Sequence, residues 1–237
     1  MTSPLRHIDE DWHRLIPSRF PPVDLYERFG VPELSAVAKE VEDKTNPRLR
    51  VKAWLLGKTP DLEESSARLQ NWNHAPFAYR NPEGSMFLNA GYGVMEVMRG
   101  ARAALTWSLR RREVFLARTQ EPPLGLDMRL LITGVRGDFV DLTAAPIDTS
   151  QARRWELGDR LYREGAKGIL FHPPEQPQLL ALAIFDNRVL GRSIQGAHYR
   201  FVWDGTRVTK VYDFTDGKEI AREDLCPAGE GKGEQAA

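Results

Sequence analysis

The sequence predicts a mixed α+β domain from three local patterns. An amphipathic helix is indicated from Pro32 to Glu42, where apolar residues recur every three or four positions. A short apolar run from Leu179 to Phe185, bounded by turn residues, is typical of a buried strand. Two strand-like segments at 198–203 and 207–214 flank the turn residues 204–206 and indicate a β-hairpin. Helical and strand patterns thus occur within one chain, as expected for the α+β class.

A glycine-punctuated block from Ser85 to Leu116 is the centre of the predicted fold. Its first part is read as two short strands on either side of a glycine-rich bend, and a helix follows from Ala101. We expect the charged run Arg110–Glu113 to end this helix, because cations suit a helix C-terminus. A strand–turn–helix unit of this kind can hold the phosphates of a ligand, and it can equally be an ordinary connection.

Further elements are expected on either side of this block. On the N-terminal side, His13–Ile16 is a strand that Pro17 ends, Asp24–Phe29 is helix-like, and residues 57–84 are a loop-rich passage. On the C-terminal side, strands are expected at 130–133 and 139–142, and a helix at 151–164 between Ser150 and Gly165.

Length and composition favour one domain with short tails. In a chain of 237 residues we predict an N-terminal tail at 1–11, one domain at 12–225 and a disordered tail at 226–237. Lys and Arg together number 33, as do Asp and Glu, so no net charge draws the protein to nucleic acid or to a membrane. The single cysteine, Cys226, excludes an internal disulfide, and no apolar run has the length of a signal peptide core or a membrane span. A cytoplasmic protein is therefore predicted.

No metal site is predicted. The five histidines are scattered, and the chain has neither a His-x-x-x-His pair nor a second cysteine. His74 lies beside aromatic residues and is expected to be a packed or surface histidine rather than a base or a ligand.

Several motifs resemble those of one known family. The central block keeps family positions in ungapped register at Ser85, Phe87, Tyr92, Gly93, Arg99, Ala104 and Arg112-Glu113. Outside the block are a Ser-Arg-Phe-Pro-Pro run at 18–22, a Thr-Asn-Pro-Arg tetrad at 45–48, and a Gly-x-x-Gly-Ile segment at 165–169. This pattern resembles the RES-domain family, bacterial toxins that consume NAD and are usually paired with a helix-turn-helix antitoxin. The resemblance implies an ADP-ribosyltransferase-like core, with short strands in two packed sheets and flanking helices.

The resemblance also implies where a cofactor would bind. Arg14 and Tyr92 match family positions and are expected to line an NAD pocket, with NAD as a substrate rather than a bound cofactor. For Arg14 a second interpretation stays open, a surface arginine paired with one of the acidic residues at 9–11.

The residues that carry the family's chemistry are replaced in this chain. Met86 stands in place of an arginine whose permanently charged guanidinium would bind phosphates through two hydrogen bonds. Trp107 stands in place of the helix glutamate, and an indole cannot supply the charge of a carboxylate. Pro173 stands in place of the active-site serine, and it offers neither a hydroxyl nor an N–H. Glu96 replaces a tyrosine, and its negative charge is expected to repel the phosphates of NAD.

Three hypotheses follow for function. The first is a catalytically degenerate RES protein that binds a partner, such as an antitoxin or a second copy of itself, or an altered ligand. The second is an active NAD phosphorylase, glycohydrolase or ADP-ribosyltransferase with an unusual residue set, in which Glu96 is the catalytic carboxylate. The third is a scaffold without a pocket, which a cleft between the central block and residues 171–174 would argue against.

Overall fold

The computed structural model describes residues 4–18, 66–67 and 70–226. The strands are β1 (Leu5–Pro17), β2 (Met95–Met98), β3 (Leu124–Asp141), β4 (Gly168–Phe171), β5 (Ala181–Ile184), β6 (Leu190–Trp203), β7 (Val208–Asp213) and β8 (Lys218–Ala221). The helices are α3 (Asn71–Ala78), α4 (Ala101–Thr119), α5 (Gln151–Arg163) and α6 (Arg222–Leu225), with a 3₁₀ turn at Asn187–Val189. The predicted α+β class is confirmed. The helical segments expected at 24–29 and 32–42, and the tetrad at 45–48, lie outside the described residues.

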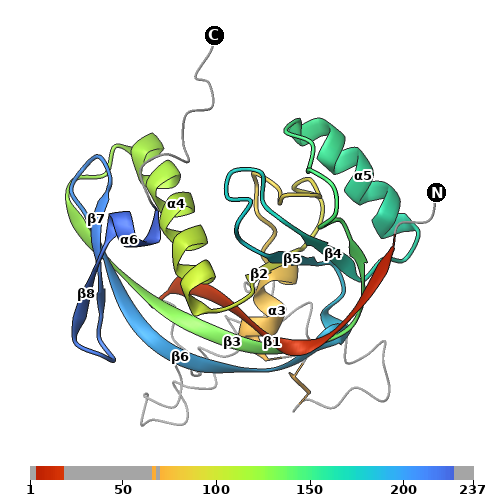
Figure 1. The fold of residues 1–237 in the computed structure, drawn as a ribbon, viewed down its shortest axis with the longest axis horizontal. Helices are drawn as coiled ribbons and strands as arrows, with labels where there is room; N and C mark the ends of the chain where they lie inside the picture. The colour runs from red at the N-terminus through yellow and green to blue at the C-terminus, as the bar shows by residue number, and fades with distance from the viewer. Residues whose placement is uncertain (1–3, 19–65, 68–69, 227–237) are drawn as a thin grey trace, which may run out of the picture.

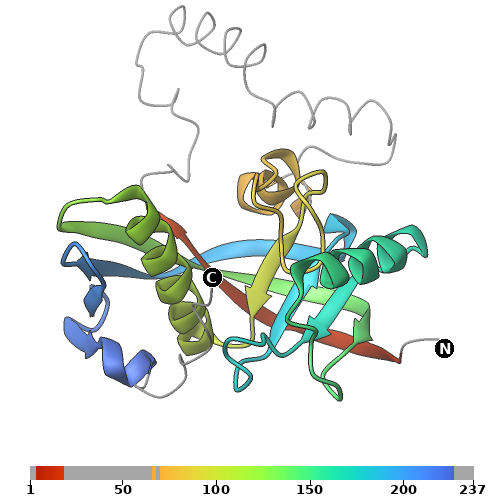
Figure 2. The same ribbon diagram turned by 90° about the horizontal axis from the view of Figure 1, so that it is seen from above.

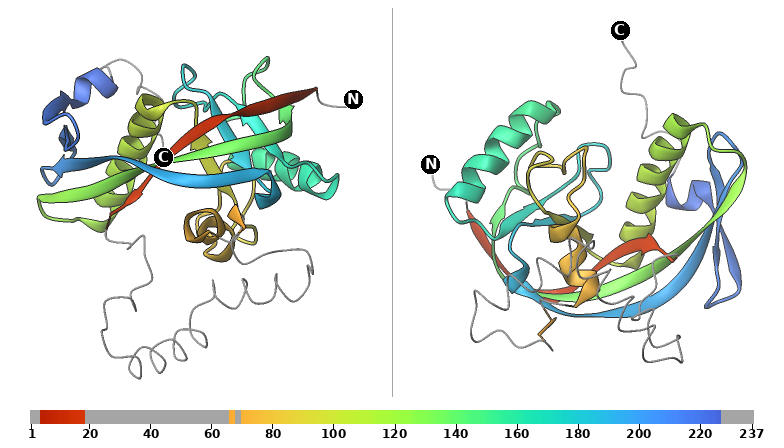
Figure 3. Two further views of the ribbon diagram at one scale, coloured as in Figure 1. Left: turned by 90° about the horizontal axis from the view of Figure 1, so that it is seen from below. Right: turned by 180° about the vertical axis from the view of Figure 1, so that it is seen from behind.

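All eight strands belong to one continuous sheet, in the order β1-β2-β5-β4-β3-β6-β7-β8. β1 also pairs with β3 over its whole length, so the first five strands of this order close into a ring. The long strands β1, β3 and β6 run side by side, and the short strands β2, β5 and β4 lie across them (Figures 1 and 3). The two groups meet at two corners, the bridge between His13 and Met98 and the parallel pairing of Val140 with Ile169. The two packed sheets implied by the resemblance are thus two layers of one hydrogen-bonded sheet, joined where the ends of the long strands reach the short ones.

β1 and β3 are both longer than predicted. β1 begins at Leu5, inside the segment expected to be a tail, and it ends at Pro17 as predicted. The two strands expected at 130–133 and 139–142 are parts of the single strand β3. The intervening glycines, Gly134 and Gly137, weaken the local strand signal, but each pairs with a residue of β1. The long-range partner therefore keeps the strand continuous.

Two apolar cores lie on the two sides of this sheet. The smaller core takes residues from both layers, among them Trp12, Met95, Phe139 and Leu182, which are almost fully buried. The larger core packs α4 against the long strands and the C-terminal hairpin, and its members include Leu109 and Phe201. Burial of such side chains stabilises a fold by about 1.5–3 kcal/mol each.

α4 begins at Ala101 as predicted, but the charged run at 110–113 does not end it. The helix continues to Thr119 because Leu116 resumes the buried face started by Leu105 and Leu109. Glu113 is held in the middle of the helix by Arg222, at 2.8 Å, and by the backbone N–H of Val208, at 3.0 Å. The charged run therefore lies within the helix, where Glu113 makes tertiary contacts, and it is not a solvated helix end.

α3 occupies part of the passage that was predicted to be loop. Side chains from its N-terminal end reach β6, where Asn73 donates to the carbonyl of Gly191 at 2.7 Å and Gln70 to that of Ser193 at 2.8 Å. His74 is 1% exposed, in agreement with a packed histidine. Tertiary hydrogen bonds thus hold a helix that has a proline, Pro76, in its interior.

The C-terminal half follows the prediction closely. α5 starts after Ser150, and Gly165 beyond its end has a positive φ of 85°. Gly158 lets α5 touch the backbone of Phe87, since a Cβ there would lie 1.8 Å from the Phe87 carbonyl oxygen. The hairpin of β6 and β7 is present, and Asp204 accepts hydrogen bonds from the backbone N–H groups of its turn.

Cys226 is 1% exposed and belongs to the folded part rather than to a tail. None of the described helices combines the length and apolar character needed to cross a membrane.

Candidate functional site

A pocket of about 930 Å³ lies between α3, α4 and the end of β1 (Figure 2 shows the two helices). One wall is formed by α3, including Trp72, and by Tyr79 directly after it, and the other by a stripe of α4 that includes Trp107 and Phe115. The segment 81–85 and alternate residues of the β2 region, Val94, Glu96 and Met98, complete the lining. This volume suits a small-molecule or peptide site. The structure therefore has a pocket, but it is not the cleft between the central block and residues 171–174 by which the hypothesis of a scaffold without a pocket was to be tested.

The β1 side of this pocket is a strand edge. β1 pairs with β2 only at His13↔Met98, and beyond this bridge the two strands diverge. The five consecutive residues 13–17 all line the pocket. Successive side chains of a strand point to opposite faces. A lining that includes all five residues must therefore run along the backbone edge of β1.

Arg14 lies at the α3 side of the pocket, where it donates a hydrogen bond to the carbonyl of Trp72. In a regular helix this carbonyl would accept from the N–H of residue 76, but residue 76 is proline and has none. Burial lowers the pKa of Arg14 to about 10. Its Nε atom is buried without a hydrogen-bond partner. The alternative of a surface arginine paired with an acidic residue at 9–11 is wrong.

Glu96 has both carboxylate oxygens engaged. Oε1 accepts from the backbone N–H of Met86 at 2.8 Å, and Oε2 forms an ion pair with Arg111. The side chain of Glu96 is only 10% exposed. The Arg111 guanidinium in turn lies 5.7 Å from the centre of the Trp107 ring, in a cation–π contact. The charge expected to repel phosphates is therefore neutralised by an arginine four residues after Trp107.

Tyr92 connects the pocket to α5. Its hydroxyl donates to Asp159 at 2.6 Å, and Asp159 also pairs with Arg163 at 2.9 Å. The hydrogen bond to Asp159 is the main reason why the pKa of Tyr92 is raised, with burial and the charge of Asp159 adding to it and Arg163 opposing it. The ring packs edge-on against Tyr162 with centroids 4.9 Å apart. Tyr92 is thus a fixed, neutral wall of the pocket.

Comparison with known proteins identifies the family. The family model described as "RES domain" matches residues 65–204, which is more than half of the chain. The chain belongs to the RES-domain family. The match spans α3 and α4, the two wall helices of the pocket, and all strands from β2 to β6.

This chain is also similar to one protein in sequence and to one in structure. An uncharacterized protein, y4oC, of Sinorhizobium fredii (strain NBRC 101917 / NGR234) is 47% identical over 219 residues, covering 92% of this chain and 94% of that protein. The toxin–antitoxin complex MbcT–MbcA of M. tuberculosis contains a chain that is similar over 81% of this chain and 86% of its own, with a TM-score of 0.44 and 10% identity. The latter likeness is too distant to bear on the chemistry of the site.

Four of the six positions singled out from the RES resemblance meet at the pocket, namely Arg14, Tyr92, Glu96 and Trp107. The other two do not line it. Met86 packs against the larger core. Its backbone N–H donates to Glu96, and its carbonyl accepts from Arg154. Pro173 is buried after β4 and accepts a hydrogen bond from the N–H of Gln176 at 3.0 Å. Residues 171–174 contribute nothing to the lining, so the cleft lies on the β1 side of the central block rather than beside Phe171.

Several pocket residues were not predicted from the sequence. Arg111 was taken as part of a solvated helix end, and Tyr79 and Phe115 were not singled out. A signal was available for α4, since residues 107, 111 and 115 recur at a spacing of four and share one helix face. No comparable signal marked α3 as a wall.

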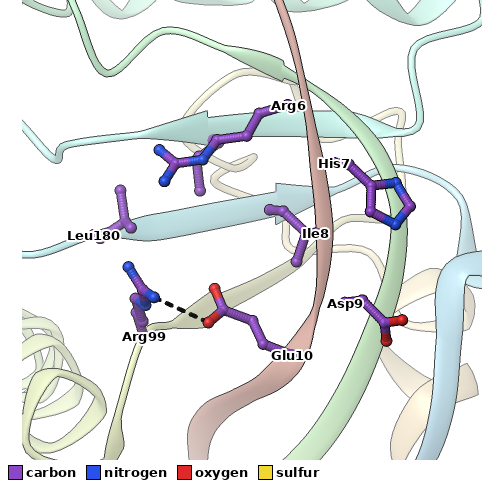
Figure 4. Close-up of a pocket in the computed structure, with 8 residues that line it drawn as sticks. Arg6, His7, Ile8, Asp9, Glu10, Arg99 and Leu180 are labelled. Atoms are coloured by element: carbon purple, nitrogen blue, oxygen red, sulfur yellow. Dashed lines mark ion pairs between the residues drawn. The ribbon is translucent and has the colours of Figure 1, made fainter.

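A second, smaller pocket of about 230 Å³ lies farther along β1. It is lined by residues 6–10 together with Arg99, Leu170 and Leu180, and Figure 4 shows Arg99 facing Glu10 beside Leu180. The Arg99–Glu10 ion pair measures 3.1 Å, and Arg6 lies 3.7 Å from Asp141. None of the predicted site residues lies there. Across the part of the chain that the structure describes, no group of histidine, cysteine and acidic side chains has the arrangement of a metal site.

Proposed function

We propose that this protein is a catalytically inactive member of the RES family, whose pocket is retained as a binding site. The alternative, an active NAD phosphorylase, glycohydrolase or ADP-ribosyltransferase, needs a free acid, base or nucleophile in the pocket. The observation that argues most directly against an active enzyme is that both carboxylate oxygens of Glu96 already have partners.

A catalytic carboxylate must be able to face the reacting atoms of a substrate. Both oxygens of Glu96 are already bonded, one to the Met86 N–H and the other to Arg111. To face a substrate, Glu96 would have to break its ion pair with Arg111. Because the Glu96 side chain is only 10% exposed, its carboxylate would then be a mostly buried charge without a partner, which costs free energy. Glu96 therefore serves the structure of the pocket, and we assign it no chemical step.

The other family positions support the same proposal. Trp107 adds an apolar ring to the pocket wall where the resemblance implies a carboxylate, and it cannot stabilise a cationic sugar. Met86 and Pro173 do not line the pocket, so neither offers a group to a ligand there. The pocket therefore combines aromatic walls with charged groups, of which Glu96 is held by Arg111 and Glu83 by Arg118.

The test is the fate of NAD with the purified full-length protein. We expect no release of nicotinamide above a buffer blank, with or without inorganic phosphate, when the products are separated by chromatography. Loss of one electrostatic group commonly costs about 10²–10³ in rate, and several are replaced here. Calorimetry under the same conditions is expected to detect no binding of NAD.

A wild type that releases nicotinamide would sink the proposal, provided that the activity is lost in both Glu96→Ala and Trp107→Ala. Those variants distinguish activity of this pocket from a contaminating enzyme, because a contaminant would be unaffected by either change. An Arg136→Gln variant is the control, because Arg136 is 78% exposed on β3 and does not line the pocket.

A further inference from the structure

We propose that the pocket is a docking groove for an extended, acidic segment of a partner protein, which adds to the free edge of β1 as a new strand. This inference rests on the proposed function, because it names the occupant of a pocket that performs no chemistry.

The free edge is the first argument. Along one side β1 pairs with β3 from Leu5 to Pro17, but along the other side its pairing with a described strand is limited to His13. Alternate residues within 14–17 therefore present backbone groups to the pocket that they line, with Pro17 able to offer only its C=O. Such an edge is a template for another strand. A helix or a small molecule could not satisfy a row of backbone groups in this way.

The walls fit the alternating side chains of an added strand. Arg14, Trp72 and Tyr79 stand on the α3 side, and Trp107 and Phe115 on the α4 side. Tyr79 and Phe115 are 47% and 52% exposed, and both are among the few large apolar side chains that the described surface exposes. Alternate residues of an extended segment would thus meet an aromatic surface on either side.

Charge complementarity selects an acidic segment. Within the pocket, Glu96 is neutralised by Arg111, and Glu83 pairs with Arg118 at 3.0 Å. Arg14 forms no ion pair with any described carboxylate, and its buried Nε has no hydrogen-bond partner. A carboxylate of the incoming segment on the α3 side would give Arg14 the partner that it lacks.

The second pocket shows that the edge remains open farther along the strand. Residues 6–10 line it, on the other side of the His13–Met98 bridge (Figure 4). It is about a quarter of the volume of the larger pocket, and both of its arginines face carboxylates. The docking segment is therefore assigned to the 13–17 side.

The experiment uses a phage library of random decapeptides, selected on the full-length protein. Peptides that bind are expected to carry an acidic residue and to alternate apolar and polar positions. Hydrogen exchange should then show new protection of alternate amides within residues 14–16. Methylating the peptide's backbone nitrogens one at a time should weaken binding at least about tenfold at every second position and little in between, because only alternate N–H groups of a strand face its neighbour.

Two variants test the location. Ser108→Trp places a large ring on the pocket face of α4 and is expected to weaken binding at least about tenfold, whereas Ala117→Trp, on the exposed side of the same helix, should leave it unchanged. Arg14→Gln should reduce the preference for acidic peptides, and Arg136→Gln should not.

The proposal is overturned if no peptide is enriched, if the bound peptides show helical spacing with no alternation in the methylation series, or if Ser108→Trp binds as well as the wild type. None of these results depends on the release of nicotinamide, so failure of the docking proposal is distinct from failure of the proposed function. Turnover of NAD by the wild type would overturn the latter whether or not peptides bind.

Discussion

Arg14 completes the hydrogen bonding of Trp72 that Pro76 leaves incomplete. The carbonyl of Trp72 lies four residues before the proline, where the helix has no N–H to offer, and the guanidinium of Arg14 donates to it instead. An arginine from β1 thereby fixes a wall helix of the pocket. This hydrogen bond links the helix directly to the strand edge of the groove.

This arrangement predicts that Arg14 and Pro76 are energetically coupled. Arg14→Met leaves the Trp72 carbonyl without its partner, a loss that typically costs about 1–3 kcal/mol for a buried group. In a Pro76→Ala background the helix supplies its own N–H, and the cost of Arg14→Met should fall by about 1 kcal/mol. Urea unfolding of the wild type, the two single variants and the double variant measures the difference. Effects that add to within about 0.3 kcal/mol would contradict the coupling.

The ion pair between Glu96 and Arg111 gives a second prediction. Arg111→Gln leaves the mostly buried carboxylate with only the Met86 N–H, and we expect the free energy of unfolding to fall by about 1 kcal/mol. The effect should shrink in 1 M salt only partly, since buried pairs are screened less than exposed ones.

Arg118→Gln is the matched control for Arg111→Gln on the same helix. Its partner Glu83 is 69% exposed, so the cost should stay within about 0.5 kcal/mol. Equal losses in the two variants would show that the Glu96 pair is an ordinary surface contact.

The sequence predicted those parts of the fold that have local causes. Pro17 ends β1, the turn at 204–206 joins β6 to β7, and Gly165 lies just beyond α5, because each residue type constrains its own backbone. The gathering of Tyr92, Glu96 and Trp107 at one pocket also followed, since all three lie in the block that resembles the RES family.

The parts that were missed depend on partners distant in the sequence. β3 appears interrupted at Gly134 until β1 is placed beside it, and α3 is held by hydrogen bonds to β6 and to Arg14 of β1. The effect of the Glu96 charge on the pocket could not be predicted, because its partner Arg111 lies fifteen residues away and was expected to be exposed at a helix end. Charge complementarity across a fold has no signature in one sequence.

Tyr92 provides a prediction about pH. The pKa of its hydroxyl is raised, chiefly by the hydrogen bond to Asp159, above the value of about 10 for an unfolded chain. Folding therefore favours the neutral phenol. The resulting stability is complete below about pH 10 and is lost as the pH rises through the folded-state pKa.

The two neighbours of Tyr92 should move this pKa in opposite directions. Asp159→Asn removes the main cause of the rise and should lower the pKa of Tyr92, whereas Arg163→Gln removes an opposing charge and should raise it. The difference in ultraviolet absorbance near 295 nm between each protein and its Tyr92→Phe counterpart isolates this tyrosine during titration. Shifts of the same sign in both variants would disprove the assignment.

Cys226 reports on how α6 is attached to the domain. It is the only cysteine, it is 1% exposed, and burial raises the pKa of its thiol although Arg110 opposes the rise. A thiol that is buried and protonated reacts slowly, so a disulfide reagent at pH 8 should modify the native protein at least about a hundredfold more slowly than the protein in urea. Thr106→Val removes the hydrogen bond from α4 to the carbonyl of Leu225, at 3.2 Å, and should speed the reaction several-fold. Thr119→Val, on the same helix but bonded only to its own turn, should not change the rate, and a native protein that reacts as fast as the unfolded chain would exclude this packing.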